Sequence, residues 1–238
     1  MPGIEERLGE SIPEGLTFLD EYGSRIELGS LVDKPTILSL TYFSCKKLCN
    51  NLSANLAGVA GMIRSSPGAE YSILTVSIDE KDTFQMARGK KRDYIKATGI
   101  AFPDNGWRFL VGDRETIGRL AASVGFGFRR LEDGFDHPAA LVVLSAEGRI
   151  IRYLYGDRFL PMDIQMALAE ASAGRTGPSI PKLLQLCYRY DPASRTYVLD
   201  ILKVSGIGVL FTAALFFIYL NKSGRKKDQK AGNGNHRK

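Results

Sequence analysis

The sequence predicts an α/β layered domain with a mixed sheet, followed by a single C-terminal membrane helix. Three observations carry this prediction. Short apolar runs rich in β-formers alternate with amphipathic helical patterns over residues 1–175. Within that stretch, residues 139–156 form two strands with only a tight turn between them, which adds antiparallel pairing to the sheet. Residues 204–220 form an uncharged apolar segment.

The predicted order is strand, helix, strand, helix, strand, helix, hairpin, helix. Besides the hairpin, the strands are short runs rich in β-forming residues, expected at 16–20, 24–28, 35–43, 71–79 and 107–113. In the first helix, apolar residues recur every three or four positions from Leu48 to Ile63, and the helix is expected to run to the SSPG turn at 65–68. Asp82 and Asp113 are expected as N-caps of the second and third helices.

Two further signals complete the helices. Gly99 is expected to end the second helix, and Pro161 suits the first position of the fourth. The basic runs at 90–92 and 129–130 are expected to lie on solvated faces.

Charge is distributed unevenly along the chain. The formal net charge of +6 equals the excess in residues 221–238, which contain seven Lys or Arg and one acid. The first 220 residues are therefore neutral overall and show no excess positive charge for a phosphate backbone. We expect no nucleic-acid partner.

The apolar segment predicts the membrane topology. Residues 204–220 are expected to form a single-pass transmembrane helix, with a buried core helix as the alternative. If the basic tail at 221–238 is cytoplasmic, as the positive-inside rule favours, residues 1–175 lie on the periplasmic side of the inner membrane and residues 176–203 form a linker and juxtamembrane segment. Residues 1–30 contain no apolar signal segment. Either the signal has been removed or is missed in this numbering, or the domain is cytosolic and tail-anchored.

Two cysteines stand at the junction of the first long strand and the first helix. Cys45 and Cys49 are four residues apart, which places both on one face of a helix. The N-terminus of a helix favours the thiolate, and Lys46 and Lys47 add positive charge. This is the thioredoxin arrangement, with three intervening residues in place of two. A metal site, a disulfide and inert buried thiols are the alternatives.

The remaining donors limit the choice of metal. A structural zinc site requires four nitrogen or sulfur ligands, whereas the predicted domain adds only His137 to the two thiols. The third cysteine, Cys187, lies past the linker, and the second histidine, His236, lies in the tail. Two thiolates and one imidazole suit copper better. A packing role for His137 is the alternative.

Three motifs together resemble the Sco/SenC family. They are the CxxxC after a strand, SIDEKDT at 77–83, and FDHPAALVVLSAEGRIIRYLYG at 135–156. The resemblance covers most of residues 8–175, and CYRYDP at 187–192 before an apolar span is similar to a bacterial branch of the family with a C-terminal membrane anchor. Lys46 and Asn50 replace the prolines that are usual in the family motif.

The resemblance implies a thioredoxin-like (peroxiredoxin-like) sandwich and a set of site residues. Cys45 and Cys49 match the family's thiol ligands and redox-active pair, His137 matches the third ligand, and Asp79 matches an acidic residue that we place in a supporting shell. One copper per chain, as Cu(I) or Cu(II), is implied. The implied partners are cytochrome c oxidase subunit II with its CuA site, and a thiol reductant or copper donor.

The function that follows is a copper metallochaperone for assembly of the CuA centre of cytochrome c oxidase. The alternative is a membrane-anchored thiol:disulfide oxidoreductase that acts on cysteines of the oxidase subunit, or a redox sensor, because the same two thiols can cycle through a disulfide. A membrane-anchored scaffold with inert cysteines is the third possibility. Whether the protein is an enzyme stays open at this stage.

Overall fold

The computed structural model describes residues 2–44, 48–177, 188–191 and 196–199, with only the backbone described for 48–50 and the last two ranges. Contacts divide the chain into two units, residues 1–179 and 180–238. The first unit contains the predicted α/β domain. In the second unit, β12 (Tyr188–Asp191) and β13 (Thr196–Leu199) pair antiparallel.

A five-stranded sheet in the order β11-β10-β4-β5-β6 forms the centre of the first unit. Its strands are β4 (Thr36–Thr41), β5 (Ser72–Ser77), β6 (Trp107–Leu110), β10 (Ala140–Leu144) and β11 (Ile150–Tyr155). β4, β5 and β6 are parallel, and β10 runs antiparallel to both β4 and β11. The sheet is therefore mixed, and β4 is its central strand.

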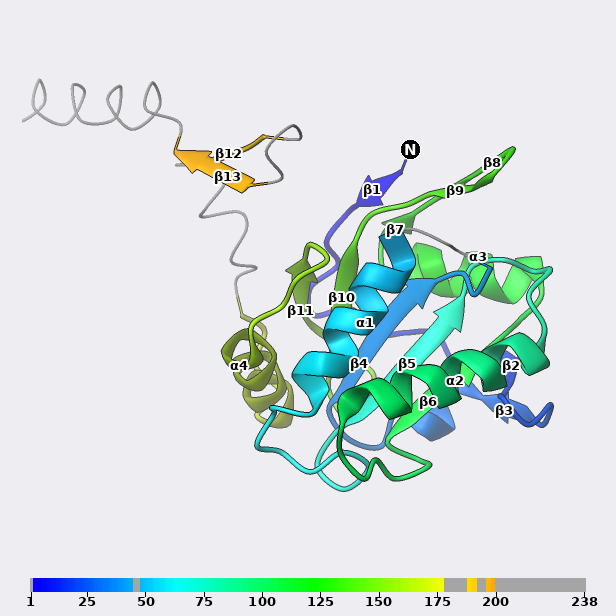
Figure 1. The fold of residues 1–238 in the computed structure, drawn as a ribbon, viewed down its shortest axis with the longest axis horizontal. Coiled ribbons are helices and arrows are strands. Elements are labelled where there is room, and N and C mark those ends of the chain that lie inside the picture. Colours follow the sequence, from blue (N-terminus) through cyan, green and yellow to red (C-terminus); the bar gives the residue numbers. More distant parts are fainter. Residues whose placement is uncertain (1, 45–47, 178–187, 192–195, 200–238) are drawn as a thin grey trace, which may run out of the picture. The chain divides into compact units, whose positions relative to one another are not determined.

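Four helices cover the sheet, as Figure 1 shows. They are α1 (Leu48–Ala60), α2 (Phe84–Thr98), α3 (Arg114–Ser123) and α4 (Pro161–Ser172). Side chains of α1, α2 and α4 share one apolar cluster with one face of the sheet. Side chains of α3 and of the N-terminal segments form the second cluster on the other face. All residues of β4, β5 and β10 are buried, as expected for strands covered on both faces.

Further short strands lie outside the central sheet, in two-stranded sheets of their own. β2 (Thr17–Leu19) and β3 (Arg25–Glu27) confirm two predicted strands and lead into a 3-10 helix, η1 (Leu28–Leu31). β1 (Gly3–Ile4) pairs with β7 (Phe126–Gly127). β8 (Arg129–Leu131) and β9 (Gly134–Asp136) form a hairpin directly before His137 that the sequence did not predict.

Most predicted helix ends are confirmed, with two corrections. The carboxylate of Asp113 accepts the Thr116 N–H at 2.7 Å, and Gly99 ends α2 with a φ of 71°. However, α2 is capped by Thr83, not by Asp82. α1 ends at Ala60, before the SSPG turn, where the chain passes close to α2: a Cβ atom on Gly61 would lie 2.3 Å from the carbonyl oxygen of Thr98.

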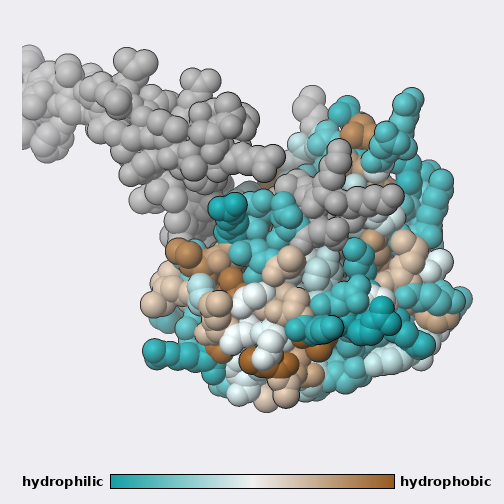
Figure 2. Space-filling model, in the orientation of Figure 1, coloured by the Kyte–Doolittle hydropathy of each residue, from teal (hydrophilic) through white to brown (hydrophobic). Residues whose placement is uncertain are grey.

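The basic run at 90–92 is not uniformly solvated. Lys91 is 7% exposed, and its Nζ contacts the buried carboxylate of Glu21 at 2.6 Å and the exposed carboxylate of Asp104 at 2.7 Å. Arg108 also pairs with Glu21, at 2.9 Å. The outer surface mixes hydrophilic side chains with smaller apolar patches, some of them over α4 (Figure 2).

The predicted membrane span at 204–220 and the tail at 221–238 lie outside the described residues. Within the part of the chain that the structure describes, no helix combines the length and apolarity needed to cross a bilayer.

Candidate metal centre

The segments that carry the predicted site residues meet at one edge of the sheet. β4 and β5 are parallel, so the loops after Thr41 and after Ser77 leave the sheet at the same edge. β10 is antiparallel to β4, so the segment before Ala140 enters the sheet at that edge too. Figure 1 shows the start of α1 at this edge. The topology therefore gathers the beginning of the cysteine helix, Asp79 and the loop with His137.

The two cysteines are described only in part. Cys45 lies outside the described residues, as does the side chain of Cys49. The backbone of Cys49 lies in the first turn of α1, as the sequence predicted. Among the side chains that are described, no group of three His, Cys, Asp or Glu is placed to hold a metal ion. The prediction that the two thiols are ligands therefore rests on the positions of the cysteines in the sequence and on helix geometry.

His137 is described, and its surroundings fix its chemistry. The half-buried ring packs edge-on against Tyr42, with centroids 5.9 Å apart, and lies 6.0 Å from the ring of Phe126. Nδ1 lies 3.0 Å from the carbonyl oxygen of Pro138, which can only accept, so in this hydrogen bond Nδ1 carries the proton. Burial lowers the pKa of His137 below its ordinary value. A neutral imidazole protonated at Nδ1 carries its lone pair on Nε2, which suits metal coordination.

Asp79 is buried in the loop after β5 and forms an ion pair. Its Oδ1 accepts hydrogen bonds from Nη2 of Arg130 at 2.5 Å and from the backbone N–H of Lys81 at 3.0 Å. The side chain is only 10% exposed, whereas that of Arg130 is 34% exposed. The carboxylate therefore joins this loop to the β8–β9 hairpin.

Asp82 is a site-edge residue that the sequence analysis assigned to a different role. Its Oδ2 accepts the backbone N–H of Phe43 at 2.6 Å and the hydroxyl of Ser77 at 2.7 Å. Burial raises the pKa of the Asp82 carboxyl, and these two hydrogen bonds oppose the rise. Asp82 and Thr83 are both residues that commonly cap helices, and only the structure shows that Thr83 caps α2 while Asp82 binds the cysteine segment.

Arg130 is the second residue that the sequence analysis missed, because it was expected on a solvated face. Besides Asp79, its Nη2 contacts Oε2 of Glu80 at 2.8 Å. Its guanidinium lies 4.4 Å from the ring centroid of Phe135, its cross-strand partner in the hairpin. A single arginine thus contacts both the loop after β5 and the strand that leads to His137.

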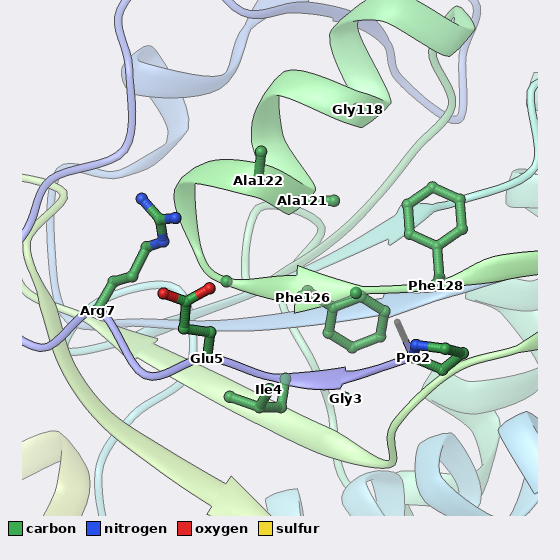
Figure 3. A pocket seen from close by; sticks show the side chains of 12 residues that line it. Pro2, Gly3, Ile4, Glu5, Arg7, Gly118, Ala121, Ala122, Phe126 and Phe128 are labelled. Atoms are coloured by element: carbon green, nitrogen blue, oxygen red, sulfur yellow. The ribbon is translucent and has the colours of Figure 1, made fainter.

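Two pockets lie at or near this part of the domain. The one in Figure 3 lies between the N-terminal segment, with Ile4 and Arg7, and α3, with Gly118 and Ala122. Its lining contains neither a cysteine nor a histidine. The other pocket is lined by Asp82 together with Gly112 and residues of β2, and so borders the loop after β5 at Asp82.

Comparison with known proteins decides the family. The model of the SCO1/SenC family matches residues 5–171. The chain belongs to this family. Among curated proteins, the comparison found no match to this SCO1/SenC chain.

Solved structures support the fold of this SCO1/SenC member. A candidate electron transfer protein of Aquifex aeolicus VF5 is 29% identical, with a TM-score of 0.64 over 70% of this chain and 95% of that one. Copper-bound ScoI of Arabidopsis thaliana is 22% identical, with a TM-score of 0.55 over 71% and 99%. BsSco, a Sco-family cytochrome c oxidase assembly protein with a disulfide switch, is 18% identical, with a TM-score of 0.55 over 71% and 97%. The predicted thioredoxin-like α/β fold with a mixed sheet is confirmed.

Proposed function

We propose that this protein binds one copper ion, as cargo, through Cys45, Cys49 and His137, and serves assembly of the CuA centre of cytochrome c oxidase. The observation that carries the proposal is the setting of His137: its half-buried ring lies at the sheet edge where α1 begins, and its Nδ1 lies 3.0 Å from the carbonyl oxygen of Pro138, which leaves Nε2 for a metal. Membership in the SCO1/SenC family, and the similarity to BsSco, a Sco-family cytochrome c oxidase assembly protein, support the connection with the oxidase.

The donor set fits copper. Thiolates are soft ligands that hold Cu(I), and imidazole accommodates both oxidation states. Cys49 lies in the first turn of α1, where unpaired N–H groups and the helix dipole favour the thiolate. The hydrogen bond from Nδ1 to Pro138 orients the ring and raises the basicity of Nε2. Copper-bound ScoI shares the fold, which agrees with this assignment.

Asp79 is proposed as a supporting residue. Its carboxylate accepts from Arg130 and from its own loop, so its contribution to the site is to hold neighbouring segments. We also propose that residues 204–220 anchor the protein in the inner membrane with the domain on the outer side, near the membrane-bound oxidase.

A thiol:disulfide oxidoreductase is the second candidate. It is favoured by the placement of the two cysteines around the N-terminus of α1 directly after the central strand. A dithiol in that position exchanges with disulfides through its thiolate. This chemistry uses the thiols and needs no imidazole ligand. A requirement for His137 therefore distinguishes copper binding from thiol–disulfide exchange.

The test is copper stoichiometry of the reduced full chain under anaerobic conditions. Wild type is expected to hold about one copper, and Cys45→Ser, Cys49→Ser and His137→Ala are expected to lose it, because three-coordinate Cu(I) depends on each donor. The chain supplies matched controls: Cys187→Ser and His236→Ala remove the remaining thiol and imidazole and should leave binding unchanged. A wild-type protein without copper that forms a reversible Cys45–Cys49 disulfide would favour the oxidoreductase.

A further inference from the structure

We propose that Arg130 is a positioning residue for His137, which it holds in place by fastening the β8–β9 hairpin to the loop after β5. This inference rests on the proposed role of His137 as a copper ligand. The sequence motifs and the apolar periodicity did not predict this hairpin, and the proposal gives the hairpin a function.

The hairpin needs such a fastening. β8 and β9 pair with each other over three residue pairs, and they form a two-stranded sheet separate from the central one. A two-stranded hairpin of this length is marginally stable by itself. All three residues of β8 are exposed, so the apolar contact between the hairpin and the domain comes through β9, whose partly buried Phe135 packs against the second core cluster. Its position therefore depends on specific side-chain contacts.

Arg130 supplies contacts in two directions. Toward the domain, Nη2 donates to Asp79 at 2.5 Å and to Glu80 at 2.8 Å. Toward the hairpin, the guanidinium lies 4.4 Å from the ring of Phe135. The carboxylate of Asp79 is buried, so this ion pair is screened less by solvent than one between two exposed groups.

From Phe135 the contacts continue to the imidazole. The ring of Phe135 lies 5.1 Å from that of Tyr42, and Tyr42 packs edge-on against His137. Phe135 is also two residues before His137 in the chain. The guanidinium, the two aromatic rings and the imidazole thus form one continuous set of contacts at the site edge.

The neighbouring arginine provides a matched control. Arg129 lies on the same strand and forms an ion pair with Asp136 at 3.1 Å, within the hairpin. Its side chain is 65% exposed. Arg129→Met therefore removes the same charge from the same strand without releasing the hairpin from the domain.

The experiment compares Arg130→Met and Arg129→Met in the full chain by two measurements that need no copper. In Arg130→Met, amide hydrogen exchange across residues 128–137 should accelerate about tenfold or more, because a charge-assisted anchor is lost. The NMR shift of the His137 ring protons, set by the rings of Tyr42 and Phe126, should change as well. In Arg129→Met, both should match wild type. Unchanged exchange and shift in Arg130→Met, or equal effects in both variants, would overturn the proposal.

Copper affinity is the third measurement, expected to fall about tenfold in Arg130→Met as for other residues that orient a metal ligand. If wild type binds no copper, the proposed function fails, while exchange and ring shifts still decide whether Arg130 positions His137. Phe135→Leu keeps the ion pairs and removes the stacked ring. It should give the same ring-shift change if Arg130→Met does not fold, and an unchanged shift would count against the proposal.

Discussion

The buried carboxylate of Asp82 accepts the backbone N–H of Phe43 at a distance of 2.6 Å. Phe43 is two residues before Cys45, so this hydrogen bond ties the cysteine segment to the loop after β5. The same loop, through Asp79, binds Arg130 of the hairpin that leads to His137. One short loop thus supports both segments that carry the proposed ligands.

Asp82→Ala is expected to loosen the cysteine segment. The change leaves the N–H of Phe43 and the hydroxyl of Ser77 without their acceptor, which should cost about 1–3 kcal/mol of unfolding free energy. Native-state hydrogen exchange of the Phe43 amide should accelerate as well. Asp113→Ala is the control: it removes an N-cap worth about 1 kcal/mol and should leave the Phe43 amide unaffected. Equal Phe43 protection in Asp82→Ala and wild type would contradict this account.

His137 should titrate below its ordinary pKa of 6.5, because burial disfavours the imidazolium. As pH falls, the unfolded chain takes up this proton before the folded protein does. The contribution of His137 to stability is therefore present above about pH 6.5 and is lost as pH falls through the folded-state pKa. An NMR titration measures the pKa, and the difference in unfolding free energy between wild type and His137→Gln should shrink on acidification. A folded-state pKa above 6.5 would contradict the lowering of the His137 pKa by burial.

Lys91→Met should destabilise the domain by about 2–3 kcal/mol, because Glu21 is fully buried and loses a charged partner. The bonds from Arg108 and from the Phe109 N–H to Glu21 survive and keep the cost from being larger. Arg92→Met is the neighbouring control. Its side chain is 81% exposed, and the change should stay within about 0.5 kcal/mol. Urea unfolding measures both, and equal midpoints would argue against the buried pair.

Two glycines near the end of α1 should respond oppositely to alanine. At Gly58 a Cβ meets nothing within 4 Å, so Gly58→Ala should stabilise the helix by about 1 kcal/mol. At Gly61 the Cβ would collide with the carbonyl oxygen of Thr98, so Gly61→Ala should destabilise the contact between α1 and α2. Thermal midpoints should move in opposite directions. A stabilised Gly61→Ala would show that the two helix ends do not meet closely.

The pattern of apolar residues along the sequence was sufficient to predict the central sheet and its covering helices. The core strands are mainly apolar runs rich in β-formers, and three of the four helices carry a capping or N1 residue that the sequence shows plainly, such as Asp113 and Pro161. The end of α1 was placed too late, because the apolar spacing continues to Ile63 while the close approach at Gly61 ends the helix.

The support of the site was harder to predict, for physical reasons. The hairpin at 129–136 has no apolar alternation, because all of β8 is exposed. The pairing of Arg130 with Asp79 joins residues 51 positions apart, so no local pattern marks it. Lys91 lies in a basic run that resembles a solvated face, and its buried partner Glu21 is 70 positions away. In each case tertiary contact, not propensity, selects the role of a polar residue.

The antiparallel pairing of β10 with β4 has a consequence for how the protein matures. Cys49 and His137 are far apart in sequence, and this strand pairing brings their segments to one edge of the sheet. A nascent chain can form α1 locally, and with it the two thiols, long before the high-contact-order step that adds the imidazole. The complete set of proposed ligands therefore exists only after β10 has paired with β4, so a chain that has not finished folding presents only two of the three proposed donors to a metal.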